Sequence, residues 1–191
     1  YGLYKGARLF GDYAVYKLCG AIFSLFFQQF TLKEDAMKDI NANPVKFDEL
    51  TGGKNCIVFT YPKMGESGKF LPENLKDLKG LTGCTLQCKA YQENLAKLES
   101  LGFTLIAASA QSVEKMNEFK QSVGANFIFL SDENFELESP LNLQTFTTND
   151  GKKFYHRQTL IMKNGEVVKR FNDVAEPAND ATNVLAAIER L

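Results

Sequence analysis

Three short apolar runs, separated by stretches with helical patterning, are the feature that most limits how this chain can fold. The runs are CIVFTY (56–61), FTLIAASA (103–110) and FIFL (127–130). Their β-branched and aromatic residues are typical of strands that are buried on both faces. Helical patterns follow the first run at 85–101 and the second at 112–124. The chain therefore alternates strand, helix, strand, helix, strand.

The C-terminal part adds a hairpin and a helix to this alternation. Two strand-like runs, 154–162 and 166–171, are joined by Lys-Asn-Gly at 163–165. Asn-Gly is a strong signal for a tight hairpin. We expect a short helix at 132–137 and a last helix at 180–191. The sequence thus predicts an α/β domain, with a central mixed β-sheet flanked by helices on both faces.

An apolar extension precedes this domain, and we place it at 1–45 with the domain at 46–191. Residues 13–30 are apolar and aromatic almost all round, without the clean spacing of a helix or a strand. Three interpretations stay open: a helix or hairpin that covers the domain or a partner protein, a helix at a membrane surface, and a membrane span. Cys19 lies in this segment, and we expect it to pack rather than react.

Composition narrows the partners and the compartment. A formal net charge of -1 over 191 residues gives no electrostatic reason to expect nucleic acid. Four cysteines do not suggest a disulfide scaffold, and no Asn-x-Ser/Thr sequon is present. We therefore expect a reducing compartment and not secretion. The sequence begins at Tyr1 rather than Met, so a processed protein of the cytoplasm or of a plastid or mitochondrial interior fits this expectation.

The segment Gly83-Cys84-Thr85-Leu86-Gln87-Cys88 is the candidate site. It places one cysteine after a glycine turn at a helix start and a second cysteine one turn later. N–H groups at a helix start are unpaired and carry partial positive charge, so they stabilise a thiolate. With one histidine in the chain, we expect no metal site, no cofactor and no cysteine–histidine hydrolase arrangement. Disulfide exchange is less favoured, because its motifs have two residues between the cysteines and this chain has three.

With these elements in order, residues 54–191 resemble a peroxiredoxin of the alkyl hydroperoxide reductase/thiol-specific antioxidant superfamily. The bacterioferritin-comigratory-protein, or Q-type, branch is the most similar. The resemblance implies a thioredoxin-like fold. The residues that carry it are Tyr61-Pro62, Gly83-Cys84-Thr85, Leu130-Ser131-Asp132 and Arg157-Gln158-Thr159-Leu160-Ile161.

The resemblance implies that Cys84 is the peroxidatic thiolate, which reduces hydrogen peroxide or an organic hydroperoxide and becomes a sulfenic acid. Arg157 would stabilise the thiolate and polarise the peroxide, and Pro62 would wall the pocket. A thioredoxin-like dithiol donor would reduce the oxidised enzyme. Cys88 is either the resolving thiol or a buried helix cysteine, and both alternatives stay open.

The chain departs from the family pattern in three places. The family has a hydroxyl residue three positions before the cysteine, where this chain has Leu81; Thr82 lies one position closer, and Thr85 is the other candidate. Cys88 follows Cys84 by four positions rather than five, and a long insertion precedes Cys84. Residues 1–30, the insertion and the displaced Thr82 motivate an alternative function, in which a catalytically weakened peroxiredoxin-like subunit docks through residues 1–30 in a larger assembly, for example in an organellar membrane.

Overall fold

The computed structural model describes residues 36–78 and 80–191. The chain divides into two units, Tyr1–Ala36 and Met37–Leu191, and the second is described here. The expectations for residues 1–30, Cys19 included, lie outside the described residues. No helix within residues 36–78 and 80–191 has the length and apolar character needed to cross a bilayer.

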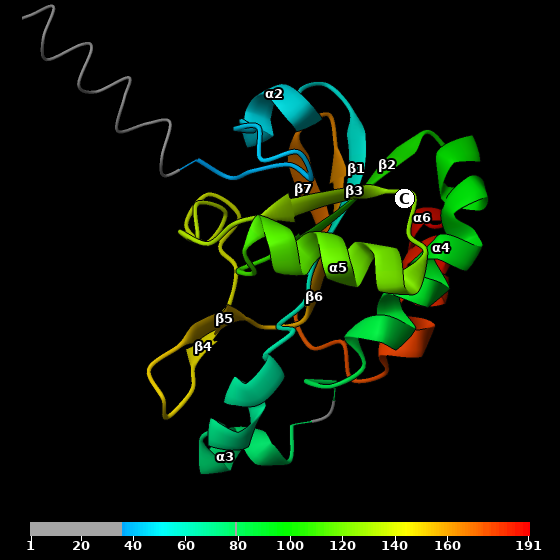
Figure 1. The fold of residues 1–191 in the computed structure, drawn as a ribbon. Coiled ribbons are helices and arrows are strands. Elements are labelled where there is room, and N and C mark those ends of the chain that lie inside the picture. Colours follow the sequence, from blue (N-terminus) through cyan, green and yellow to red (C-terminus); the bar gives the residue numbers. More distant parts are fainter. Residues whose placement is uncertain (1–35, 79) are drawn as a thin grey trace, which may run out of the picture. The chain divides into compact units, whose positions relative to one another are not determined.

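A five-stranded mixed sheet forms the centre of the described unit (Figure 1). Three neighbouring strands, β1, β2 and β3, run parallel, and β6 joins β1 on its other side in antiparallel orientation. The edge strand β7 pairs antiparallel with β6, as the Asn-Gly turn predicts. The order in the sheet is β3-β2-β1-β6-β7, with β1 at Asn55–Thr60, β2 at Phe103–Ser109, β3 at Ile128–Ser131, β6 at Gln158–Lys163 and β7 at Glu166–Phe171.

The three long helices lie on one face of this sheet: α4 (Cys84–Ser100), α5 (Val113–Val123) and α6 (Asp180–Ile188). Because strand side chains alternate between faces, Phe59 of β1 points to these helices and Val58 to the opposite face. The opposite face is covered by the short helix α2 (Phe47–Thr51) and the segment after β3. The predicted thioredoxin-like fold is confirmed, with its long helices on a single face.

The helix that we expect at 132–137 does not form. The chain makes a series of turns there instead, because the Asp132 carboxylate accepts hydrogen bonds from the N–H groups of Glu136 and Leu137, 2.8 and 3.0 Å long. Phe135 adopts a left-handed conformation with φ of 58°. A side chain that binds backbone N–H groups in this way competes with helix formation.

The single strand expected at 154–162 is divided in two. Its first part, β5 (Lys153–Tyr155), pairs with β4 (Thr145–Thr147) in a separate ribbon, and its second part is β6 in the main sheet. At the interruption between β5 and β6, the backbone of His156 makes two hydrogen bonds to other segments. Its N–H donates to Gln144 O (2.9 Å) and its carbonyl accepts from Thr60 Oγ1 (2.7 Å). Arg157 therefore lies at the end of the sheet and not within a strand.

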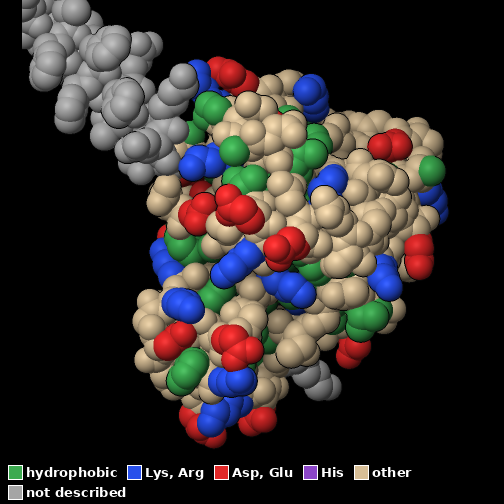
Figure 2. Space-filling view, viewed as in Figure 1, with side chains coloured by type: hydrophobic (Ala, Val, Ile, Leu, Met, Phe, Trp, Pro, Cys, Tyr) green, Lys and Arg blue, Asp and Glu red, His purple; other side chains and the backbone are tan. Residues whose placement is uncertain are grey.

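The insertion after β1 contains two short helices, η1 (Gly65–Phe70) and α3 (Glu73–Lys76). It is tied to the turn between β4 and β5, where Ser67 Oγ donates to Asp150 (2.9 Å) and Asn149 N donates to Phe70 O (2.7 Å). A last 3-10 turn, η2 (Pro177–Asn179), leads into α6. On the face drawn in Figure 2, acidic and basic side chains are intermingled, in keeping with the formal net charge of -1.

Candidate active site

Cys84 is the first residue of α4, at the edge of the apolar core, and it is 7% exposed. The preceding Gly83 has a φ of 98°, which residues with side chains rarely adopt. A Cβ on Gly83 would lie 3.1 Å from Cγ of Pro177, so the turn before Cys84 packs closely against η2. Glycine therefore allows the start of α4 to approach the C-terminal segment.

Arg157 reaches Cys84 from the end of the sheet and is 3% exposed. Its Nη2 lies 3.0 Å from Cys84 Sγ. Its remaining hydrogen bonds go to neutral oxygens: Nε to Gly80 O (2.5 Å), Nη1 to Gln87 Oε1, and Nη2 to Leu81 O (3.4 Å). The two residues that the resemblance singles out are thus brought into contact across 73 positions of sequence.

The electrostatic surroundings of the Cys84 sulfur include a guanidinium and the start of a helix. The sulfur lies 3.0 Å from Nη2 of Arg157, and Cys84 is the first residue of α4, where helix N–H groups carry partial positive charge. Among the described residues, no carboxylate is within salt-bridge distance of this guanidinium. The Asp180 carboxylate is linked to this guanidinium through the amide of Gln87.

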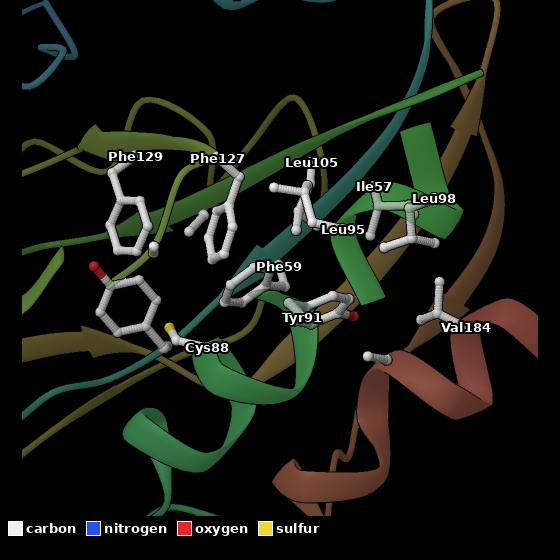
Figure 3. Close-up of a cluster of buried hydrophobic side chains, with 14 of the residues drawn as sticks. Ile57, Phe59, Cys88, Tyr91, Leu95, Leu98, Leu105, Phe127, Phe129 and Val184 are labelled. Carbon is white, nitrogen blue, oxygen red and sulfur yellow. The ribbon is translucent and has the colours of Figure 1, made fainter. Parts of the chain in front are cut away.

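Cys88 lies one turn further along α4 in very different surroundings. Its side chain is fully buried on the helix face that packs against an aromatic cluster of Phe59, Phe127 and Phe129, as Figure 3 shows. Burial raises the pKa of Cys88 to about 12, and the neighbouring Cys84 acts in the same direction. In this helical state Cys88 is a neutral core residue.

The other predicted site residues are placed as follows. Thr82 is exposed, and its hydroxyl makes no hydrogen bond with any described residue; Thr85 is exposed on the first turn of α4. Pro62 is buried two residues after the end of β1. The structure brings neither hydroxyl against the sulfur, and the Leu81 side chain is buried.

Two polar residues at the site escaped the sequence analysis. Gln87 accepts a hydrogen bond from Arg157 and donates one to Asp180 Oδ2 (2.8 Å). Its spacing of three from Cys84 places it on the same side of α4, and this signal could have identified it. Asp180 gives no such signal, because an acidic residue in the first turn of a helix is usually an exposed partner of the helix dipole. Burial raises the pKa of Asp180, while its hydrogen bonds lower it.

Metal ligands are not grouped in the part of the chain that the structure describes: no cluster there has three or more His, Cys, Asp or Glu side chains.

Comparisons with known proteins give the family of the chain and the structures that share its fold. The family model described as Redoxin matches residues 27–188. No curated protein matches the sequence. The solved structures whose fold this chain shares include Q-type peroxiredoxins, in agreement with the expected resemblance.

Three of these structures match the fold with similar TM-scores. The bacterioferritin comigratory protein of Xanthomonas campestris is 18% identical, with a TM-score of 0.63 over 81% of this chain and 89% of that one. Peroxidoxin BcpB of Mycobacterium tuberculosis is 15% identical, with a TM-score of 0.64 over 81% and 91% of the two chains. A mutant PrxQ of Xylella fastidiosa is 15% identical, with a TM-score of 0.62 over 81% and 86%.

Proposed function

The chain belongs to the Redoxin family, and we propose that it is a thiol-dependent peroxidase in which Cys84 attacks the peroxide. The observation that carries this proposal is the 3.0 Å contact between Arg157 Nη2 and Cys84 Sγ at the start of α4. A thiolate, not a thiol, is the nucleophile, and a cation with a helix N-terminus is the arrangement that maintains it.

In the proposed first step, the Cys84 thiolate attacks the terminal oxygen of a hydroperoxide. An S–O bond forms as the O–O bond breaks; sulfur is oxidised to sulfenic acid, and the departing oxygen takes up a proton and leaves as water or an alcohol. Negative charge moves from sulfur to the departing oxygen during this step. Arg157 and the N–H groups of α4 are fixed donors beside that path, and such preorganised donors stabilise the transition state.

The proposed substrates are hydrogen peroxide and organic hydroperoxides. The Xanthomonas bacterioferritin comigratory protein has alkyl peroxide reduction activity, and this chain shares its fold. Cys84 is 7% exposed, so only a small part of this residue is open to solvent.

In the proposed second step, Cys88 resolves the sulfenic acid. Its thiol attacks the Cys84 sulfur, a disulfide forms and water leaves; a thioredoxin-like dithiol then reduces the disulfide. Side chains four apart on an intact helix do not meet in relaxed disulfide geometry, so the first turn of α4 has to unwind. Helix ends are the part that opens most easily. A reducing compartment, the cytoplasm or an organelle interior, would supply the dithiol.

Peroxide consumption by the purified full chain, with a thioredoxin system as reductant, tests this function. We expect turnover by the wild type and none by Cys84→Ser, in which an alcohol replaces the thiol. Equal consumption by the two proteins would reject Cys84 as the reacting residue. A folded wild-type protein that consumes no peroxide would instead favour the non-catalytic, docked subunit.

A further inference from the structure

A buried carboxyl group that the proposed reaction does not use lies behind Arg157. Asp180, the first residue of α6, is 1% exposed. Its Oδ2 accepts three hydrogen bonds, each 2.8 Å long, from Gln87 Nε2, Tyr91 Oη and Thr159 Oγ1. Burying a carboxylate is costly unless donors surround it, so this concentration of donors on one oxygen calls for an explanation.

The amide of Gln87 connects Asp180 to Arg157. Its Oε1 accepts from Arg157 Nη1, while its Nε2 donates to Asp180. A guanidinium has only donors and a carboxylate only acceptors, so each neighbour demands the same orientation of the amide. Without the carboxylate, the amide could turn over and direct its NH₂ group at the guanidinium, donor against donor.

We propose that Asp180 is a positioning residue for Arg157, which acts through Gln87 and holds the guanidinium against Cys84. The inference rests on the roles proposed above for Cys84 and Arg157. In this arrangement the C-terminal helix α6 fixes the amide, the amide fixes Nη1, and Nη2 of the same rigid planar group lies 3.0 Å from the sulfur.

The remaining contacts of Arg157 cannot replace this link. Gly80 O binds only Nε, and the Leu81 O contact, at 3.4 Å, is long for a hydrogen bond. Gln87 is the side chain that fixes the far end of the guanidinium. Since Gln87 is itself fully buried, its orientation depends on Asp180 and not on water.

The first test is the isosteric change Asp180→Asn in the full chain. An amide oxygen accepts fewer and weaker hydrogen bonds than a carboxylate, so the link to Gln87 loosens. We expect the rate constants for oxidation of Cys84 by hydrogen peroxide and for its alkylation by iodoacetamide both to fall about five- to tenfold. Peptide mass spectrometry assigns both reactions to Cys84.

Two electrostatic effects of this change have opposite signs. Loss of a nearby negative charge would by itself favour the thiolate, whereas loss of the arginine contact disfavours it. The direct contact at 3.0 Å outweighs a charge on the far side of Gln87, because Coulomb interactions weaken with distance. Both rates are therefore expected to fall.

A double-mutant cycle separates positioning from a general structural role. In an Arg157→Met background, Asp180→Asn should change both rates by less than about twofold, because its effect passes through the missing arginine. Equal losses in both backgrounds would overturn the proposal, as would an unchanged rate in Asp180→Asn alone.

Tyr91→Phe is the matched control. It removes one hydrogen bond to the same Oδ2 but leaves Gln87 bound, so both rates should stay within about twofold of the wild type. A loss equal to that of Asp180→Asn would contradict the inference. If Asp180→Asn does not fold in thermal unfolding, Gln87→Met takes its place in the cycle, with the same Arg157-dependent loss expected.

The two readouts also separate this inference from the proposed function. If alkylation of Cys84 depends on Asp180 and Arg157 but the wild type consumes no peroxide, the peroxidase is rejected and the positioning role stands. If the wild type consumes peroxide and Asp180→Asn changes neither rate, the peroxidase stands and the positioning role of Asp180 is rejected.

Discussion

The first and second turns of α4 each carry a cysteine, and their surroundings differ completely. Cys84 lies beside a guanidinium at a helix start, while Cys88 is fully buried among aromatic rings and has a pKa raised to about 12. The same residue type, on the same helix, thus has two chemical characters. Position at the helix start and tertiary neighbours together distinguish the two thiols.

Among the changes considered, removal of the Arg157 guanidinium should have the largest effect on the reactivity of Cys84. Arg157→Met keeps an unbranched side chain but deletes the donor to Cys84 Sγ, so the rate constant for Cys84 oxidation should fall about a hundredfold or more. Stopped-flow measurement with hydrogen peroxide gives this rate. Arg157→Lys keeps the charge but loses the fork of donors, so its rate constant for Cys84 oxidation should lie between those of the wild type and Arg157→Met. A change of less than about threefold in Arg157→Met would show that the arginine is structural.

Removing the second thiol should separate the two half-reactions. Cys88→Ala leaves Arg157 and Cys84 in place, so the first oxidation should keep its rate, while turnover with a thioredoxin system falls by at least about tenfold. Rapid-mixing and steady-state assays on one preparation measure both. Unchanged turnover would assign Cys88 to packing alone.

Alkaline pH should expose the buried character of Cys88. Its pKa is raised from 9.0 to about 12 in the folded protein, so the folded state holds the proton that the unfolded state releases between these values. This contribution to stability is complete below about pH 9 and is lost as the pH rises toward 12. Across that range, the unfolding free energy of the wild type should fall more steeply than that of Cys88→Ala, by up to about 1.4 kcal/mol per pH unit. Parallel curves in urea titrations would contradict the buried, neutral thiol.

The smallest effect is expected at Thr82. Its hydroxyl is exposed and binds no described residue, so Thr82→Val should change the Cys84 oxidation rate by less than about twofold. A loss of tenfold or more would mean that this hydroxyl reaches the peroxide during the reaction.

Much of the fold followed from the sequence, because apolar runs and helical spacing are local signals. The expected strands at 103–110 and 166–171 and the helix at 112–124 agree with β2, β7 and α5 to within one residue at their ends. The failures occur where side chains bind distant or non-helical backbone. The Asp132 carboxylate accepts hydrogen bonds from N–H groups that a helix would use. The strand is interrupted at His156, whose carbonyl binds the Thr60 side chain and whose N–H binds the carbonyl of Gln144.

The site was only partly predictable for a similar reason. Local sequence marks Cys84 through the glycine turn and the helix start, whereas Arg157 was found through the family resemblance. The Asp180–Gln87 link joins residues 93 positions apart, and its meaning depends on packing of α6 against α4 that no local pattern encodes.

The central claim is that Cys84, and not Cys88, takes the peroxide oxygen. Trapping the sulfenic acid with dimedone tests it most directly, after treatment of the full chain with stoichiometric hydrogen peroxide. The Cys88→Ala variant preserves the adduct, because no resolving thiol competes with the trap, and peptide mass spectrometry locates it. We predict a dimedone adduct on Cys84 in this variant and none in Cys84→Ser. Peroxide consumption with no adduct on Cys84 in Cys88→Ala, or an adduct on Cys88 in Cys84→Ser, would contradict the account.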